Sequence, residues 1–236
     1  MSYHSDRIAP TWRAGVASNH AVVDLAGYAA TTSRNQAGES YRSVRAFLAA
    51  SQHEQEQVLA WAKRQLESGE QVLSLEEVEL GPPVPDPEKI VCLGLNYPEH
   101  AAEAKLDIPP VPTFFAKFRN SLVGPTSPVI LPAASHFIDY EGELVAVIGR
   151  RCKHVTEQEA LASVAGYTIC NDVSARDLQM QTSQWTAGKA IDTFAPMGPG
   201  IVLAADIPNP QALTLTTRVN GQVVQRESTS QMIFSV

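Results

Sequence analysis

The stretch that decides the fold is Asp139-Tyr140-Glu141-Gly142-Glu143-Leu144-Val145-Ala146-Val147-Ile148-Gly149, which is followed further on by Asn171-Asp172-Val173-Ser174-Ala175-Arg176-Asp177. Side chains alternate across a β-strand, so Glu141 and Glu143 are expected to point to the same face. Both faces of this strand are largely apolar, which predicts burial on both sides. Two carboxylates at the start of a buried strand must be compensated, because an unpaired buried carboxylate is costly.

A third carboxylate, Asp172, follows the apolar run 164–170 and is therefore also expected at the end of a strand. An isolated Glu-x-Glu more often marks a solvated strand end. Three carboxylates with several waters, however, suit an octahedral Mg²⁺ or Mn²⁺ ion, which prefers oxygen ligands. Together with the motifs below, Glu141, Glu143 and Asp172 predict a divalent-metal site.

Composition is that of an ordinary globular protein of 236 residues, of which 44% are hydrophobic. The net charge of -7 and the absence of a basic tract argue against a nucleic-acid partner. No apolar stretch is long enough to span a membrane. The cysteines Cys92, Cys152 and Cys170 form no C-x-x-C pair, so we expect reduced core residues in a cytoplasmic protein.

A segment rich in proline, residues 81–88, excludes a helix or a central strand and predicts a linker. It separates a small N-terminal unit, residues 1–80, from a larger domain, residues 89–236. The first unit carries no group of side chains typical of chemistry, and we expect it to have a packing role.

Within the first unit, residues 21–25 are typical of a short strand. Ser40 is expected to cap a helix over residues 41–50. Ser51 and Glu54 have the spacing of a capping box that begins a second helix, and Gly69 could end it.

The larger domain consists of short apolar runs broken by glycine and proline, which predicts an α+β, strand-rich fold. The expected strands cover residues 89–95, 111–118, 129–131, 144–149, 167–170, 200–204 and 213–219. Asn220-Gly221 lies between the last run and Gln222-Val223-Val224, which is a strong signal for a β-hairpin.

From about Lys89 onward the sequence resembles the fumarylacetoacetate hydrolase superfamily. The motifs that carry the resemblance are specific in their order and spacing. They are Gly94-Leu95-Asn96-Tyr97 with His100 and Glu103, Phe115-Ala116-Lys117, 120–125, Tyr140-Glu141-Gly142-Glu143-Leu144, 171–179, Trp185 with Gly188-Lys189, and 192–199. The resemblance implies a mixed β-sheet roll that holds one Mg²⁺ or Mn²⁺ ion, and a homodimer.

Carried over residue by residue, the resemblance makes Glu141, Glu143 and Asp172 the metal ligands, in agreement with the strand parity. It makes His100 and Glu103 a catalytic dyad on a segment that closes over the substrate. Their i, i+3 spacing also places them on one face of a helical turn, where a carboxylate can orient an imidazole.

Lys189 follows a glycine within apolar sequence, and the resemblance implies that it contacts substrate oxygens near the metal. Arg176 and Gln179 stand three residues apart and are expected to bind substrate oxygens, since arginine suits a carboxylate. Tyr97 and Lys117 are weaker candidates for substrate binding, because a tyrosine can be core and a lysine can reach solvent from a strand.

The resemblance implies a metal-assisted reaction of a small 2-oxo acid, in which the ion stabilises an enolate. For a β-diketo acid of the acylpyruvate or fumarylpyruvate type, the dyad would activate water and a C–C bond would be cleaved. The same constellation serves oxaloacetate decarboxylation, isomerisation of hydroxymuconate-type dienes and dehydration of sugar acids. Family resemblance does not choose among these reactions.

Members of this family usually continue past a segment like 228–234, whereas this chain ends at Val236. We therefore also carry the hypothesis of a fragment, or of a shortened, non-catalytic binding or assembly subunit.

The motifs of other enzyme classes are missing from the sequence. The sequence has no H-E-x-x-H or C-x-x-C zinc motif, no G-x-S-x-G turn of a serine hydrolase, and no phosphate-binding loop after a strand.

Overall fold

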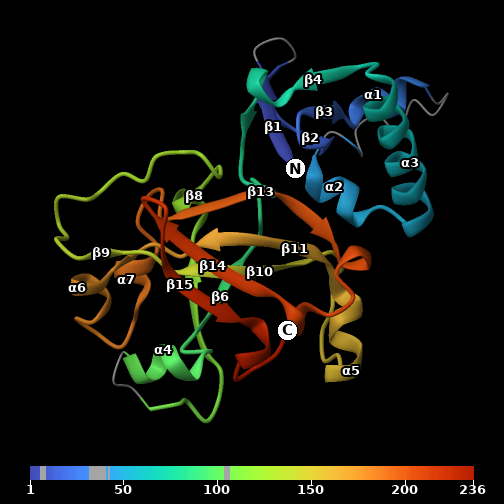
Figure 1. The fold of residues 1–236 in the computed structure, drawn as a ribbon. Helices are drawn as coiled ribbons and strands as arrows, with labels where there is room; N and C mark the ends of the chain where they lie inside the picture. The colour runs from blue at the N-terminus through green and yellow to red at the C-terminus, as the bar shows by residue number, and fades with distance from the viewer. Residues whose placement is uncertain (6–8, 32–40, 42, 104–106) are drawn as a thin grey trace.

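The computed structural model describes residues 1–5, 9–31, 41, 43–103 and 107–236. Its first part is an antiparallel sheet with the strand order β4-β3-β2-β1-β5, and three helices lie beside it (Figure 1). The elements are β1 (Ser2–Ser5), β2 (Ala9–Ala17), β3 (Ala21–Asp24), α1 (Ala26–Thr31), α2 (Val44–Ala49), α3 (Gln52–Ser68), β4 (Val72–Ser74) and β5 (Glu79–Leu80).

Helix α3 begins and ends as the sequence predicts. Ser51 accepts a hydrogen bond from the Glu54 backbone N–H, the Glu54 side chain accepts one from the Ser51 backbone, and Gly69 closes the helix at φ 74°. Helix α2 differs, because it begins after Ser43, whose side chain caps it. The expected cap at Ser40 lies outside the described residues.

The larger part is built around a four-stranded sheet with the order β10-β11-β13-β8, in which β13 and β8 are parallel and the other pairs are antiparallel. Three strand pairs surround it, namely β6–β7, β9–β12 and β14–β15. Short helices connect the strands, so the strand-rich α+β fold is confirmed. The elements are β6 (Ile90–Gly94), α4 (Pro98–Glu103), β7 (Thr113–Lys117), β8 (Leu122–Val123), β9 (Ile138–Asp139), β10 (Gly142–Ile148), α5 (Glu157–Ala160), β11 (Val164–Asn171), β12 (Ser174–Ala175), α6 (Arg176–Gln179), α7 (Thr186–Lys189), β13 (Ala195–Leu203), β14 (Thr214–Val219) and β15 (Gln222–Ser228).

One expected strand is absent, because residues 129–131 lie in no helix or strand. Prolines at positions 128 and 132 flank this run and cannot donate to a ladder. Instead, the backbone N–H of Ile130 donates to Thr193 Oγ1 at 2.8 Å. The flanking prolines thus prevent strand pairing, although the run itself is apolar.

The hairpin predicted at Asn220-Gly221 is confirmed, since these residues join β14 to β15. Both have positive φ, 50° and 82°, as a two-residue hairpin turn of this type requires. Figure 1 shows the hairpin crossing in front of the region where β6 and β10 lie.

The N-terminal unit shares its core with the larger sheet. Its buried cluster contains Val23, Phe47 and Trp61, and partly buried side chains of β10, β11 and β13 pack against that cluster. These are Val147, Ala165, Ile201 and Leu203. The unit therefore covers part of the sheet, which accords with a packing role.

Residues 81–88 contain no helix or strand, as four prolines predict. Pro83 is nevertheless fully buried, and Ser2 Oγ donates to the Pro82 carbonyl at 2.5 Å.

The expectation that the three cysteines are reduced core residues holds only in part. All three thiols are free, but Cys152 is exposed in the loop after β10, while Cys170 is buried and Cys92 is partly buried.

Candidate active site

Strand register brings two of the acidic side chains together. In the pairing of β10 with β11, Gly142 lies opposite Asn171 and Glu143 lies opposite Cys170. The backbone N–H of Asp172 also donates to the Glu141 carbonyl at 2.7 Å. The two strand ends therefore meet where the carboxylates stand, which is the physical reason that sequence-distant acids share one site.

These strand ends open into a cavity of about 500 Å³. Its walls come from β6, α4, β7, the segment around β10, α6, α7 and β15. The cavity is lined by every predicted site residue except Asp172 and Lys117, namely Tyr97, His100, Glu103, Glu141, Glu143, Arg176, Gln179 and Lys189.

Lys189 holds two of the carboxylates together. Its Nζ lies 2.6 Å from Glu141 Oε2 and 3.1 Å from Asp172 Oδ2, and the side chain is almost completely buried. Its ammonium also lies 5.1 Å from the centroid of the Phe115 ring. A buried lysine is stable as an ammonium only when paired, so these contacts fix its position.

Lys117 lies behind the site instead of in the cavity wall. Its Nζ donates to the carbonyls of Val173 at 3.2 Å, Phe194 at 2.9 Å and Lys189, and it lies 2.8 Å from Asp172 Oδ1. The last contact is an ion pair between two buried side chains. Lys117 therefore supplies positive charge beneath Asp172 and ties three backbone segments together.

Arg176 bridges two acids on the other side. Its guanidinium donates to Asp139 Oδ2 at 2.7 and 2.9 Å and to Glu141 Oε1 at 2.5 Å, and also to Gln179 Oε1 at 3.1 Å. Burial opposes ionisation of Glu141, but Lys189 and Arg176 outweigh it and hold its pKa below the usual value.

Glu143 is the carboxylate that lacks a partner. Its side chain makes no hydrogen bond or ion pair with any residue of the described chain. Burial, with the negative charges of Glu141 and Asp172, raises its pKa to about 8. Such a group favours either a proton or a cation next to it.

The donor set fits a hard divalent ion in its chemistry. The Glu143 carboxylate lines the cavity and makes no ion pair in the described chain, whereas Asp172 Oδ1 is already 2.8 Å from the Lys117 ammonium. The described residues contain no ready-made cluster of three His, Cys, Asp or Glu side chains around one position. The reason is visible in the contacts, because Glu141 and Asp172 both turn an oxygen toward Lys189.

Gly142, between the two glutamates, has a steric role that the sequence alone does not reveal. A Cβ at this position would lie 2.3 Å from Thr217 Oγ1 and 3.0 Å from Gln225 Oε1. Gln225 accepts from the Gly142 N–H at 2.8 Å and donates to its carbonyl at 3.0 Å. The hairpin β14–β15 thus clamps the backbone that carries both glutamates.

Helix α4 brings His100, Glu103 and Glu99 to the cavity. The His100 and Glu103 side chains line the same cavity without a hydrogen bond between them. Tyr97 lies just before the helix, its side chain is buried, and its hydroxyl has no hydrogen-bond partner in the described structure.

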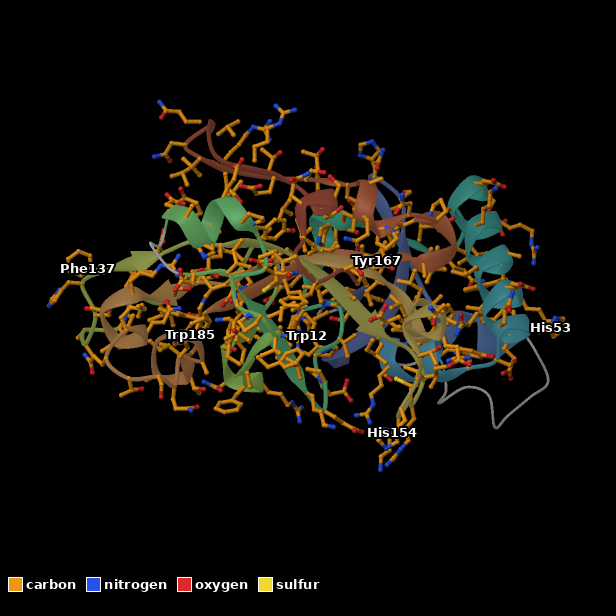
Figure 2. All side chains as sticks on the ribbon, turned by 90° about the horizontal axis from the view of Figure 1, so that it is seen from below. Trp12, His53, Phe137, His154, Tyr167 and Trp185 are labelled. Carbon is orange, nitrogen blue, oxygen red and sulfur yellow. The ribbon has the colours of Figure 1, made fainter. Side chains whose placement is uncertain are left out.

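The apolar wall of the cavity depends on one glycine. Phe115 and Trp185 meet edge to face with ring centroids 5.6 Å apart. A Cβ at Gly94 would lie 2.2 Å from the Trp185 ring, so glycine is required there for the ring to approach β6. Figure 2 shows Trp185 among densely packed side chains near the short helices.

Sequence reasoning missed several residues of the cavity. Asp139 accepts hydrogen bonds from the predicted residue Arg176, Gln225 binds the backbone of Gly142 between the two glutamates, and Glu227 lines the cavity from β15. Asp139 stands two residues before Glu141, so strand parity could have placed it on the same face. Nothing local predicts Gln225 or Glu227, because the packing of the hairpin against β10 is a long-range contact.

This structure belongs to the class of strand-rich folds that combine mixed sheets with short helices. Comparison with known proteins identifies the family. The fumarylacetoacetate (FAA) hydrolase C-terminal family model matches residues 89–236. The chain therefore belongs to the fumarylacetoacetate hydrolase family.

Individual relatives agree with this assignment. The mitochondrial oxaloacetate tautomerase fahd2 of Xenopus laevis is 43% identical over 181 residues, which make up 76% of this chain and 57% of that protein. The 2-hydroxyhepta-2,4-diene-1,7-dioate isomerase from Mycobacterium marinum is 44% identical, with a TM-score of 0.62 over 70% of this chain and 60% of that chain. This chain thus spans less than two thirds of the length of each.

A third similar structure covers the whole chain. Maleylpyruvate hydrolase from Sphingobium sp. SYK-6, solved in complex with manganese(II) ion and pyruvate, is 25% identical with a TM-score of 0.75. It aligns with 100% of this chain and 79% of its own.

Among the described helices, none is both long and apolar enough to cross a membrane. The cytoplasmic location stays a prediction.

The clamp at Gly142 generates a first prediction. Gly142→Ala should lower the free energy of unfolding by about 1–3 kcal/mol, because the added methyl group overlaps Thr217 Oγ1. The double variant Gly142→Ala/Thr217→Ala should recover part of that loss. Gly200→Ala is a matched control, since its Cβ would meet only Met1 at 3.6 Å. Denaturant unfolding measures all four proteins, and a fully stable Gly142→Ala would contradict the clamp.

The pKa of Glu143 generates a second prediction. It is about 8 in the folded protein against 4.5 as its ordinary value, so ionised Glu143 destabilises the fold increasingly from about pH 4.5 to about pH 8. In chelator-treated protein, Glu143→Gln should raise the melting temperature most at about pH 8, by about 2–4 °C per kcal/mol recovered. The gain in melting temperature should be several-fold smaller near pH 5 and should vanish below about pH 4. Glu157→Gln on the exposed α5 should show no such trend, and an equal effect of Glu143→Gln at both pH values would refute the assignment.

Proposed function

We propose that this chain is a divalent-metal-dependent enzyme that cleaves a C–C bond in a β-diketo acid of the acylpyruvate type. The single observation that carries the proposal is the buried Glu143 carboxylate, which lines the cavity near the negative charges of Glu141 and Asp172 and makes no ion pair in the described chain. The manganese and pyruvate bound to the similar maleylpyruvate hydrolase support both the metal and the 2-oxo acid.

In this proposal Glu141, Glu143 and Asp172 hold Mg²⁺ or Mn²⁺. When bound, the ion would act as a Lewis acid that polarises the 2-oxo group and stabilises negative charge there. Lys189 adds positive charge at the same end, because its Nζ lies within 3.1 Å of both Glu141 and Asp172. Lys117 keeps Asp172 in place from behind and does not meet the substrate.

Substrate orientation falls to Arg176, Gln179 and Tyr97. Arg176 is already bound to Asp139 and Glu141, so it holds the carboxylate array rigid as well as presenting positive charge to the cavity. Gln179 is buried, and its amide is oriented by the Arg176 guanidinium. The Tyr97 hydroxyl has no hydrogen-bond partner in the described structure and can donate to a substrate oxygen.

The dyad His100 and Glu103 would activate water. His100 takes a proton as the water oxygen attacks the distal carbonyl carbon, and the bond from that carbon to the methylene carbon then breaks. The methylene carbon receives a proton and becomes the methyl group of pyruvate, while the acyl half leaves as a carboxylic acid. Glu103 stabilises the charged imidazole during this exchange.

A second candidate function is keto–enol tautomerisation or isomerisation of a 2-oxo acid at the same site. The observation that favours it is the 43% identity to the oxaloacetate tautomerase of Xenopus laevis. Both reactions pass through the same charge on the 2-oxo oxygen. They differ in whether a water attacks, which the proposal assigns to His100.

We also propose a homodimer. Val91 and Phe114 stand on one face of the β6–β7 pair, opposite the face that carries Phe115, and are 62% and 67% exposed. Apolar side chains this exposed on a sheet are typical of a contact surface. Sedimentation of the full chain would measure the association.

Turnover tests the proposed function. Chelator-treated protein should release no pyruvate from acetylpyruvate, and added Mn²⁺ or Mg²⁺ should restore release with an equal amount of acetate. If the protein only interconverts the enol and keto forms of oxaloacetate, the second candidate replaces the first. Loss of every activity with metal present would favour a binding subunit.

The dyad generates a third prediction. His100→Ala should lower kcat for acetylpyruvate by about 100-fold or more, the usual contribution of general acid–base catalysis, while Mn²⁺ binding persists. His53→Ala is the control, because His53 is exposed on helix α3 at the opposite end of the molecule from Trp185 (Figure 2). A fully active His100→Ala would remove the dyad from the mechanism.

A further inference from the structure

We infer that the cavity selects a 2-oxo acid whose far end carries no charge, because Glu227 and helix α4 make that end acidic while the cations of the cavity are all engaged. The inference rests on the proposed function and names its substrate class. An acylpyruvate with a neutral acyl group fits it, and a dicarboxylate does not.

The positive groups of the cavity are already neutralised. Among the described lining residues, the lysine and arginine side chains are Lys189 and Arg176 only. Lys189 bonds to Glu141 and Asp172, and Arg176 bonds to Asp139 and Glu141. A substrate's 2-oxo carboxylate can share these cations at the metal end. A second carboxylate would find no free cation in this part of the lining.

Another part of the cavity lining is acidic. Glu99 and Glu103 approach from α4, and Glu227 approaches from β15. None of the three makes an ion pair within the described chain. Their mutual repulsion and partial burial raise the pKa of Glu227, with burial the larger cause. His100 lies beside them on α4, and the proposed mechanism uses it as the base that accepts a proton from water.

Tyr97 offers a hydrogen-bond donor to a substrate oxygen in the cavity. Its side chain is only 6% exposed, its hydroxyl has no hydrogen-bond partner, and it lines the cavity. Burial, together with the negative charges of Glu143 and Glu227, raises the pKa of Tyr97 to about 12, so the hydroxyl stays protonated. A buried hydroxyl without a partner is costly, and a carbonyl oxygen of the substrate would satisfy it.

The remaining wall agrees with an uncharged group. Leu93, Phe115, Met180, Trp185 and Val224 contribute apolar surface to the cavity. Negative charge beside apolar surface rejects a carboxylate more strongly than it rejects an alkyl or acyl group, since specificity follows from repulsion as well as attraction. The dioate named for the similar Mycobacterium marinum isomerase is therefore not the substrate class expected here.

A matched pair of unreactive ligands tests the inference without turnover. 2-Oxopentanoate and 2-oxoglutarate share the 2-oxo acid head and the chain length, and differ in the terminal carboxylate. Calorimetric titration of the Mn²⁺-loaded full chain should give a dissociation constant for 2-oxopentanoate that is about tenfold lower, the effect of one modest charge contact. Glu227→Gln should narrow the ratio, whereas the exposed Glu157→Gln should leave it as in the parent.

The outcomes separate this inference from the proposed function. If both ligands bind equally, or 2-oxoglutarate binds more tightly, the site takes 2-oxo acids but the charge selection is wrong. A ratio that Glu227→Gln does not change would equally overturn the role of Glu227. If neither ligand binds, the proposed function and the inference fall together.

Discussion

The structure depends on compensating carboxylates that are buried where two strands end. Burial of Glu141, Glu143 and Asp172 is costly, and the pairing of β10 with β11 requires it because their register sets these strand ends side by side. Lys189, Lys117 and Arg176 supply the opposing charge. The Glu143 side chain makes no ion pair in the described part of the chain, and this imbalance is the basis of the proposed cation site.

The surrounding elements hold this array at fixed geometry. Gln225 and Thr217 of the hairpin clamp Gly142, and the glycine is what lets the hairpin approach. Lys117 ties three carbonyls behind Asp172. The N-terminal unit packs against Val147 and its neighbours on the same sheet, so a part of the chain without chemistry supports the strands that carry it. A preorganised site of this kind requires little rearrangement when a ligand binds.

Much of this could be predicted from the sequence, because it follows from local rules. Strand parity placed Glu141 and Glu143 in one cavity, and Asn220-Gly221 and the Ser51–Glu54 box gave the hairpin and the start of α3 correctly. Long-range packing could not be predicted in this way. The clamp by Gln225 and the acidic Glu227 depend on where a hairpin docks, and flanking prolines overrode the apolar run at 129–131.

Direct detection of the cation tests the central claim most sharply. Mn²⁺ would be titrated into the chelator-treated full chain and followed by electron paramagnetic resonance, in the parent and in Glu143→Ala. The account predicts saturable binding of one ion in the parent, a changed spectrum when oxalate is added, and loss of both in the variant. Mn²⁺ that stays free with the parent, or that binds Glu143→Ala equally well, would contradict a metal site built on these carboxylates.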